Sequence, residues 1–118
     1  MPKRADLDVR FRLRVRQGQT IAIGPGKIDL LEAVQQCGSI SAAARSLNMS
    51  YRRAWMLLDE LNASLDSPAT SSEQGGAKGG GSVLTPVGEA VIELYRAIER
   101  QASQACAKDI ERLTSLLK

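Results

Sequence analysis

A mainly α-helical protein with a small β element is predicted by three features of this sequence. Residues 39–64 carry the spacing of two short helices around a tight turn, and a glycine-rich stretch follows over residues 67–84. Over residues 85–118 apolar side chains recur every three or four positions, which is the period of an amphipathic helix. Together these features predict a single winged helix-turn-helix domain, spanning residues 1–118, that ends in a long C-terminal helix.

Residues 7–16 alternate strictly between apolar and basic side chains, which predicts a β-strand with one buried face. The apolar positions are Leu7, Val9, Phe11, Leu13 and Val15, and the basic positions are Arg10, Arg12, Arg14 and Arg16. The arginine face could lie along a phosphate backbone or meet an acidic partner. We favour a solvated edge strand, because charged side chains on an edge discourage aggregation.

Residues 17–26 are rich in turn formers and interrupt the alternation. A helix is predicted to run from Gly26 or Lys27 to Cys37, with Gly38 as its C-terminal stop. Its apolar stripe consists of Ile28, Leu31 and Val34. This helix would support the helix-turn-helix that follows.

The helix-turn-helix pattern rests on positions that must be small or apolar, because two helices cross there with little room between them. These positions are Ala43, Ala44, Leu47, Met49, Ala54 and Leu57. Asn48 falls in the turn, and asparagine tolerates a left-handed backbone better than most residues. The hydroxyls of Ser41 and Ser50 are predicted to cap the two helices. Since the second helix of such a unit enters the major groove, we interpret the segment as a DNA-binding module.

The charge distribution supports this interpretation. No acidic residue occurs between Glu32 and Asp59, whereas four basic residues lie in or beside that window. They are Lys27, Arg45, Arg52 and Arg53. A helix that approaches phosphates cannot carry carboxylates at its leading end. A plain structural hairpin is the weaker alternative, because its exposed face would usually mix both signs. The net charge of the whole chain is only +3, so the polarity is local.

The glycine-rich stretch is interpreted as a wing, a hairpin whose tip can approach DNA. It follows the second helix of the pair and precedes a strand-like Val83-Leu84. Lys78 is flanked by glycines, among them Gly79, so bare backbone amides and one cation could approach phosphate closely. A flexible linker is the alternative. The glycine–lysine order of a nucleotide-binding phosphate loop is absent, so nucleotide binding is rejected.

The last segment, residues 85–118, is predicted to be one long helix that pairs with a second copy of the chain. Thr85 and Pro86 give it a capping hydroxyl and a proline at the first helical position, and Glu89 lies in its first turn. The predicted dimer interface consists of Val91, Tyr95, Ile98, Ala102, Cys106, Ile110, Leu113 and Leu117. A domain of this size cannot cover such a stripe alone, so a homodimer is expected. The stripe drifts between Ala102 and Ile110, which predicts a bend there.

Several other classes of function are excluded by composition. The chain lacks histidine, and Cys37 and Cys106 stand 69 positions apart without the spacing of a metal site. In a chain without a secretion signal we expect both to be buried thiols rather than a disulfide. No nucleophile–base pair can be assembled, so neither an enzyme nor a cofactor is expected. No apolar run reaches membrane-spanning length, so we expect a soluble, cytoplasmic protein without a membrane partner.

The order of strand, helix, helix-turn-helix, wing and long helix resembles the DNA-binding domain of the ModE family of molybdenum-responsive regulators, whose helix-turn-helix is of the LysR type. The stretch GSISAAARSLNMSYRRAW resembles the family's helix-turn-helix. The stretch GGAKGGGSVLTPVGEAVIELY, residues 75–95, resembles its wing and the start of its dimer helix. The resemblance covers most of the chain. It implies a homodimer that binds a palindromic operator in double-stranded DNA and controls molybdenum-related genes.

The resemblance does not extend to sensing of molybdate. Full-length members carry a C-terminal molybdate-binding part with a SARNQ-like motif, which these 118 residues do not contain. We therefore expect that a metabolite signal either comes from a separate effector-sensing protein or is lacking.

The residues expected to contact DNA are Ser39, Ser41, Arg45, Ser50, Tyr51, Arg52, Arg53, Lys78 and Gly79. Arg52 is the first choice for a base contact, since arginine pairs with guanine O6 and N7, and Arg53 is assigned to a phosphate. Tyr51 could donate to a phosphate or pack under the hairpin, and Trp55 is expected in the core. A protein-interaction module that keeps this fold without sequence-specific DNA binding is the alternative function.

Overall fold

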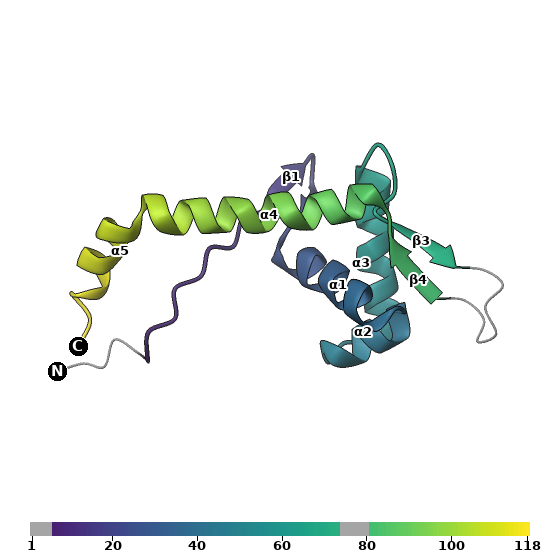
Figure 1. Ribbon diagram of the computed structural model, residues 1–118, viewed down its shortest axis with the longest axis horizontal. Helices are drawn as coiled ribbons and strands as arrows, with labels where there is room; N and C mark the ends of the chain where they lie inside the picture. Colours follow the sequence, from purple (N-terminus) through teal and green to yellow (C-terminus); the bar gives the residue numbers. More distant parts are fainter. Residues whose placement is uncertain (1–5, 74–80) are drawn as a thin grey trace.

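The computed structural model describes residues 6–73 and 81–118. Its strands are β1 (Val15–Gln17), β2 (Thr20–Ile23), β3 (Thr70–Glu73) and β4 (Gly81–Leu84), and its helices are α1 (Pro25–Cys37), α2 (Ile40–Ser46), α3 (Tyr51–Ser64), α4 (Pro86–Ala105) and α5 (Ala107–Thr114). Helices α1 to α3 and two hairpins form a body, from which α4 projects (Figure 1). The fold is a winged helix-turn-helix with a long C-terminal helical arm, as predicted.

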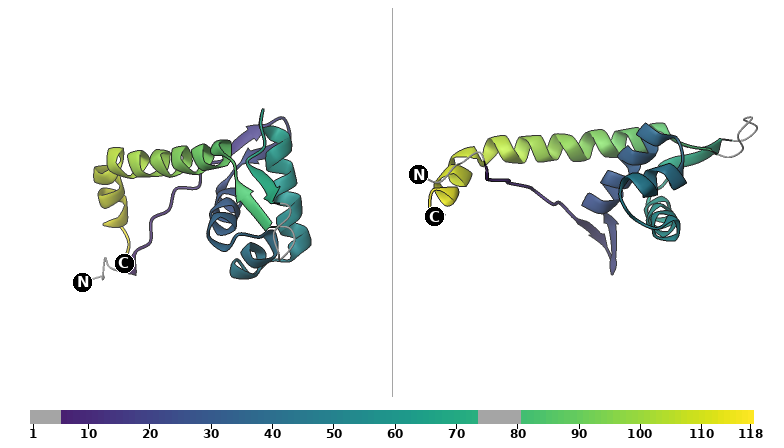
Figure 2. Two further views of the ribbon diagram at one scale, coloured as in Figure 1. Left: turned by 45° about the vertical axis from the view of Figure 1, so that its right-hand side comes forward. Right: turned by 90° about the horizontal axis from the view of Figure 1, so that it is seen from below.

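The arm makes the molecule elongated. Its principal extents are 58 × 29 × 24 Å and its radius of gyration is 17.3 Å. A compact domain of this length would have a radius of gyration of roughly 13–14 Å. From below, α4 extends away from the body on one side while the wing hairpin extends on the other (Figure 2).

The predicted strand over residues 7–16 is wrong for most of its length. Only Val15–Gln17 forms a strand, which pairs antiparallel with Thr20–Ile23 across a turn at Gly18. Residues 7–14 belong to no strand, because the sheets in the described part of the chain, β1 with β2 and β3 with β4, offer them no partner. The carbonyl of Leu13 instead accepts a hydrogen bond from the Tyr95 hydroxyl of α4, at 2.8 Å.

The core is built around α1. The predicted stripe is fully buried, and Leu30 and Ala33 are buried beside it, so the buried face of α1 is wider than a single stripe requires. The buried residues of α1 to α3 that form the core cluster are Leu30, Leu31, Ala33, Val34, Ala43, Ala44, Ala54, Leu58 and Leu61. Leu47, Met49 and Leu57 pack against this cluster while partly exposed.

Local signals set the ends of these helices. Gly38 ends α1 at φ +80°, and Asn48 adopts φ +59° in the turn, both as predicted. The hydroxyl of Ser50 caps α3 by accepting a hydrogen bond from the Arg53 amide at 3.1 Å. The cap of α2 is Ser39 rather than Ser41, because α2 begins at Ile40 and Ser39 is the residue before its first turn.

The wing segment forms an antiparallel hairpin at its two described ends, so the flexible-linker alternative does not hold there. Asn62 of α3 fixes the base of the hairpin: its Oδ1 accepts from the Ala69 amide at 2.8 Å, and its Nδ2 donates to Thr70 Oγ1 at 3.2 Å. The amide of Ser82 donates to the carbonyl of Gly38, at 2.9 Å, at the junction of α1 and α2. The hairpin is therefore held by both α3 and the start of the helix-turn-helix.

Gly88 is the point where α4 packs against the base of the wing. A Cβ at this position would lie 2.2 Å from the carbonyl oxygen of Ala69, which is a backbone atom and cannot rotate away. Gly88→Ala is therefore expected to destabilise the fold by about 1–3 kcal/mol, as overpacking does. Urea denaturation would measure the loss.

Gly26→Ala is the matched control, because Gly26 also follows a proline in the first turn of a helix and a Cβ there meets nothing within 4 Å. Alanine at that position should be neutral or stabilise by up to about 1 kcal/mol. Equal effects of the two substitutions would show that Gly88 is not constrained by Ala69.

The prediction of one continuous helix over residues 85–118 is wrong, and the predicted bend is confirmed. Thr85 caps α4 and Pro86 opens it, but the helix breaks at Cys106, where φ is −101° and ψ is 8°. No residue of α5 is buried. Leu117 lies beyond the end of α5.

The two cysteines are free thiols and both are exposed, so the expectation that they are buried is wrong. Cys37 is the last residue of α1 and Cys106 is the helix break, and both places face solvent. None of the helices in the described part of the chain combines the length and apolar character needed to span a membrane.

Candidate nucleic-acid interface

Helix α3 presents a basic and aromatic face to solvent. Ala54, Leu58 and Leu61 bury the opposite face in the core. With 3.6 residues per turn, Arg52 and Met56 then point most directly away from the core. Tyr51 and Trp55, spaced four apart, form the flank toward the wing, and Arg53 lies on the other flank. No acidic side chain occurs in the first two turns, so the leading end of α3 is suited to approach a polyanion.

The other predicted DNA-contacting residues of the helix-turn-helix lie on the surface or at its edge. Ser41, Arg45 and Ser50 are exposed, whereas Ser39 is partly buried because its hydroxyl is engaged in capping α2. Ser50 is likewise engaged in capping α3. Lys78 and Gly79 lie outside the described residues.

A groove separates α3 from the wing, and we call it the wing groove. Its volume is about 290 Å³, and it is lined by Ser39, Ile40, Ser41, Tyr51, Trp55, Ser72, Gly81 and Ser82. Trp55 is 49% exposed in its wall, so its predicted place in the core is wrong. Ala54 and Leu58 occupy the core face of α3, and the turn of the helix places Trp55 to one side of that face. Tyr51 is 54% exposed and does not pack under the hairpin.

The other flank of α3 is tied to the body by an ion pair. Lys27 of α1 is only 5% exposed, its Nζ lies 3.2 Å from Glu60 Oε1, and it donates a hydrogen bond to the carbonyl of Ile21. Lys27 was counted among the basic residues near the DNA-binding segment, but this engagement removes it from any DNA surface. It fixes the orientation of α3 instead.

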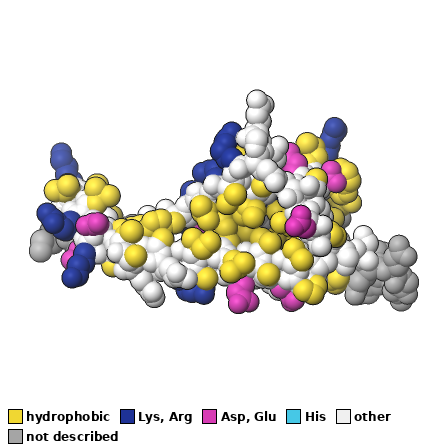
Figure 3. Space-filling model, turned by 90° about the horizontal axis from the view of Figure 1, so that it is seen from above, with side chains coloured by type: hydrophobic (Ala, Val, Ile, Leu, Met, Phe, Trp, Pro, Cys, Tyr) yellow, Lys and Arg dark blue, Asp and Glu magenta, His cyan; other side chains and the backbone are white. Residues whose placement is uncertain are grey.

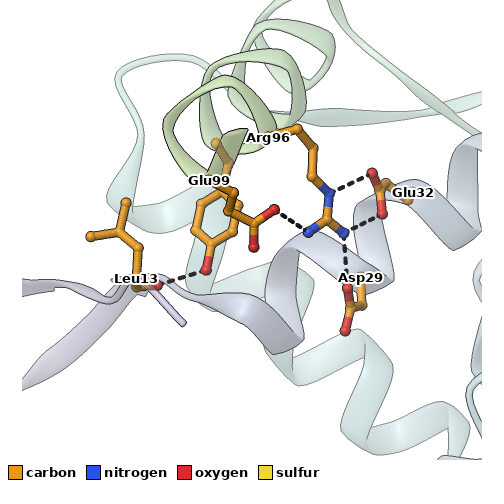
Figure 4. A network of polar contacts seen from close by, with 6 residues as sticks. Leu13, Asp29, Glu32, Arg96 and Glu99 are labelled. Atoms are coloured by element: carbon orange, nitrogen blue, oxygen red, sulfur yellow. Dashed lines mark hydrogen bonds and ion pairs between the residues drawn. The ribbon is translucent and has the colours of Figure 1, made fainter. Parts of the chain in front are cut away.

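Arg96 links α4 to α1 through the carboxylates of Glu32 and Asp29, and it also pairs with Glu99 of its own helix (Figure 4). Its guanidinium forms a two-point contact with Glu32 at 2.9 and 2.5 Å, and further bonds to Asp29 at 3.1 Å and Glu99 at 2.8 Å. These contacts, first of all those with Glu32, raise the pKa of Arg96 above its ordinary value. Beside it, burial and then the Glu99 carboxylate raise the pKa of Tyr95. The network sets the direction in which α4 leaves the body.

Arg96→Gln is expected to lower the free energy of unfolding by about 1–2 kcal/mol, since three carboxylates would remain together without their cation. The partly exposed setting keeps the loss below that of a fully buried pair. Thermal or urea unfolding would measure it. Arg100→Gln is the control, because Arg100 is exposed on the same helix and makes no ion pair among the described residues. A loss no greater than that of the control would show that the network contributes nothing to stability.

An apolar face runs along the upper side of α4, where hydrophobic side chains gather in the view from above (Figure 3). Leu94 is 63% exposed and Ile98, one turn later, is 48% exposed. Of the predicted dimer stripe, Tyr95 is 2% exposed and Val91 packs against the core, so both face the body of their own chain. Leu94 was not predicted to belong to this stripe. The stripe was drawn through Val91 and Tyr95, and a stripe through Leu94 fits the helical period equally well. In the last segment Leu113, Leu116 and Leu117 are exposed.

The capped α3, its tight turn and the anchored wing define a winged helix-turn-helix DNA-binding module. The chain belongs to the lysR family of bacterial regulatory helix-turn-helix proteins, whose pattern matches residues 26–89. This is a family of transcriptional regulators and not of enzymes.

Curated relatives narrow the likeness to ModE-type regulators. The chain is 37% identical over 93 residues to the transcriptional regulator ModE of Haemophilus influenzae, covering 79% of this chain and 36% of that protein. It is 35% identical over 89 residues to the DNA-binding transcriptional dual regulator ModE of Escherichia coli K12, covering 75% and 34%. It is 46% identical over 77 residues to the molybdenum-pterin-binding protein MopB of Rhodobacter capsulatus, covering 65% and 28%. The chain spans between 28% and 43% of the length of these and similar relatives.

Solved structures share the fold at lower identity. The DNA-binding domain of CbnR in complex with DNA matches with a TM-score of 0.55 and 24% identity, over 76% of this chain and 95% of that domain. Full-length LysG from Corynebacterium glutamicum matches with a TM-score of 0.56 and 18% identity, over 78% of this chain and 30% of LysG.

Proposed function

We propose that this chain binds a palindromic operator as a homodimer and acts in transcriptional regulation of the ModE type, with molybdenum-related genes as targets. The observation that carries the proposal is the leading end of α3. Ser50 caps it, Arg52 points directly away from the core, and no carboxylate is present in its first two turns. Arginine in this position can read guanine in the major groove.

The dimer is supported by the exposed apolar face of α4. Leu94 and Ile98 lie one turn apart and leave an exposed apolar row along a protruding helix, and such rows are candidates for contact with a partner. A second copy of the same helix is the simplest cover, because an isologous contact buries the same patch on both chains. Two recognition helices related by a two-fold axis would then match two half-sites about one turn of DNA apart.

The link to molybdenum is supported by the named functions of the relatives, several of which are ModE regulators or molybdenum-pterin-binding proteins. Upstream DNA of a molybdate-uptake gene is therefore the target to test beside the chain's own upstream DNA.

A salt-titrated binding assay of the purified protein against its own upstream DNA and a shuffled duplex tests the proposal. Preference for the real sequence by at least about a thousandfold, with a steep loss of affinity as salt rises, is expected of a specific regulator. Equal, weak binding to both duplexes would overturn the proposal and favour a protein-interaction module instead.

A further inference from the structure

A second cavity lies on the flank of α3 that faces away from the wing, and we call it the basic cavity. Its volume is about 490 Å³. Its walls come from the N-terminal segment, the β1–β2 hairpin, the start of α1 and one flank of α3. Three arginines line it: Arg12, Arg14 and Arg53. Arg12 and Arg14 have no part in the function proposed above.

The basic cavity carries an excess of positive charge. Four of its described lining side chains are cations, and one, Glu60, is a carboxylate. Glu60 lies 3.2 Å from the buried ammonium group of Lys27, so these two charges largely cancel each other. The three arginines form no ion pair with any residue in the ranges 6–73 and 81–118. Their charge is therefore left for a ligand to neutralise.

The fold brings these arginines together from separate parts of the chain. Arg14 lies across the start of α1, since a Cβ on Gly24 would meet its Cγ at 3.6 Å. Arg53 reaches the cavity from the first turn of α3, on the flank opposite Tyr51 and Trp55. Like charges held around one cavity repel each other, and the field that they create there concentrates anions.

The lining suits an anion that carries a phosphate group. A guanidinium presents its N–H donors as a planar fork that can engage two phosphate oxygens at once. Gln19 and Thr20 add an amide and a hydroxyl to the lining, and both can donate hydrogen bonds to a phosphate oxygen. The volume is in the range of pockets that hold small molecules.

We propose that the basic cavity binds a small phosphate-bearing anion, such as a phosphate monoester or pyrophosphate, through Arg12, Arg14 and Arg53. The site itself needs no DNA and stands apart from the proposed function. Its effect on regulation rests on the proposed function, in which Arg53 contacts a DNA phosphate. An anion that engages the Arg53 guanidinium removes this contact and lowers the affinity for the operator. By linkage, the operator lowers the affinity for the anion by the same factor.

Calorimetric titration of the purified chain with sodium pyrophosphate tests the site, without DNA and in a chloride buffer of constant ionic strength. Saturable binding of one pyrophosphate per chain is expected, with a dissociation constant below about 1 mM. Arg14→Gln should weaken this binding at least about tenfold, because it removes a charged hydrogen-bond donor. Arg14→Lys keeps the charge without the planar fork, so its affinity should lie between those of the wild type and Arg14→Gln.

Arg16→Gln is the matched control. Arg16 is exposed two positions further along the same segment, forms no ion pair among the described residues and lies outside the lining of the cavity. This variant should bind pyrophosphate as the wild type does. Unchanged melting temperatures without ligand would exclude a folding defect in each variant. Absence of saturable binding to the wild type, or equal losses in Arg14→Gln and Arg16→Gln, would overturn the inference and leave the proposed function intact.

The effect on regulation is measured by the anisotropy of labelled operator DNA, in pyrophosphate and in chloride at the same ionic strength. Pyrophosphate should lower the operator affinity about five- to tenfold more than chloride does, and Arg14→Gln should lose most of this difference. Saturable pyrophosphate binding with equal operator affinity in both salts would overturn the effect on regulation and retain the site.

The inference and the proposed function can fail separately. Pyrophosphate binding by a chain that binds no operator would retain the site and remove the proposed function. In a chain that binds no pyrophosphate, Arg14→Gln could still lower both the operator affinity and its salt dependence. That result would assign these arginines to the DNA backbone and overturn the inference.

Discussion

Replacing Arg52 and Arg53 by alanine together should reduce operator binding by at least about a hundredfold. Both side chains are exposed in the first turn of α3, so their removal takes nothing from the core. An arginine that pairs with a guanine contributes about 1–3 kcal/mol of discrimination, which is about five- to 150-fold. A phosphate contact adds a further loss that depends on salt.

The two single substitutions should affect different quantities, the sequence preference in one case and the overall affinity in the other. Arg52→Ala should relax the preference for the operator over a shuffled duplex, because it removes a base contact. Arg53→Ala should weaken binding to both duplexes alike and lower the slope of log affinity against log salt by about one. DNA anisotropy across a salt series measures both quantities for each variant.

Arg112→Ala is the control for loss of one positive charge, because Arg112 is exposed on α5, far from α3 (Figure 1). It should bind nearly as the wild type does. A double variant of Arg52 and Arg53 that keeps wild-type affinity and preference would rule out α3 as the recognition helix.

Leu94→Glu combined with Ile98→Glu should convert a dimer into monomers and thereby remove tight operator binding. The two residues are one turn apart on the exposed apolar face of α4, and two carboxylates there would repel their symmetry mates and remain solvated only in the monomer. Sedimentation equilibrium or light scattering at a series of concentrations gives the oligomeric state. Operator affinity should fall at least about a hundredfold, since each monomer engages only one half-site.

The matched control lowers the net charge by the same amount, at two positions with the same spacing, on another side of α4. Arg100→Gln combined with Gln104→Glu lowers the charge by two, and both residues are exposed. This variant should remain dimeric. A Leu94 and Ile98 variant that stays dimeric would move the interface elsewhere, with the exposed leucines of the last segment as the next candidates.

Much of the fold could be predicted because its signals are local. The cap at Ser50, the stop at Gly38 and the left-handed turn at Asn48 each depend on a few neighbouring residues, and each is found where the residue type predicts it. The helical period of residues 85–105 and the proline at residue 86 predict α4 in the same way. Hairpin pairing of the wing followed from strand-like residues beside a run of glycines.

The errors share a different cause. An alternating pattern forms a strand only if a second strand lies beside it, and residues 7–14 have none within the ranges 6–73 and 81–118. An apolar stripe along α4 does not reveal which of its residues meet the chain's own core and which remain exposed. In the structure Tyr95 and Val91 face the core of their own chain, whereas Leu94 is exposed.

The sequence alone determined the class of this protein, the second helix of its helix-turn-helix and the absence of acidic side chains from that helix's leading end, because composition, period and caps are properties of short segments. Only the tertiary structure decided that Trp55 stands in a groove beside the wing and that Lys27 is buried against Glu60. It also decided that Arg96 fixes the direction of α4. The positions of these three side chains depend on which surfaces of separate elements pack together. Burial follows from that packing and cannot be read from one segment of the sequence.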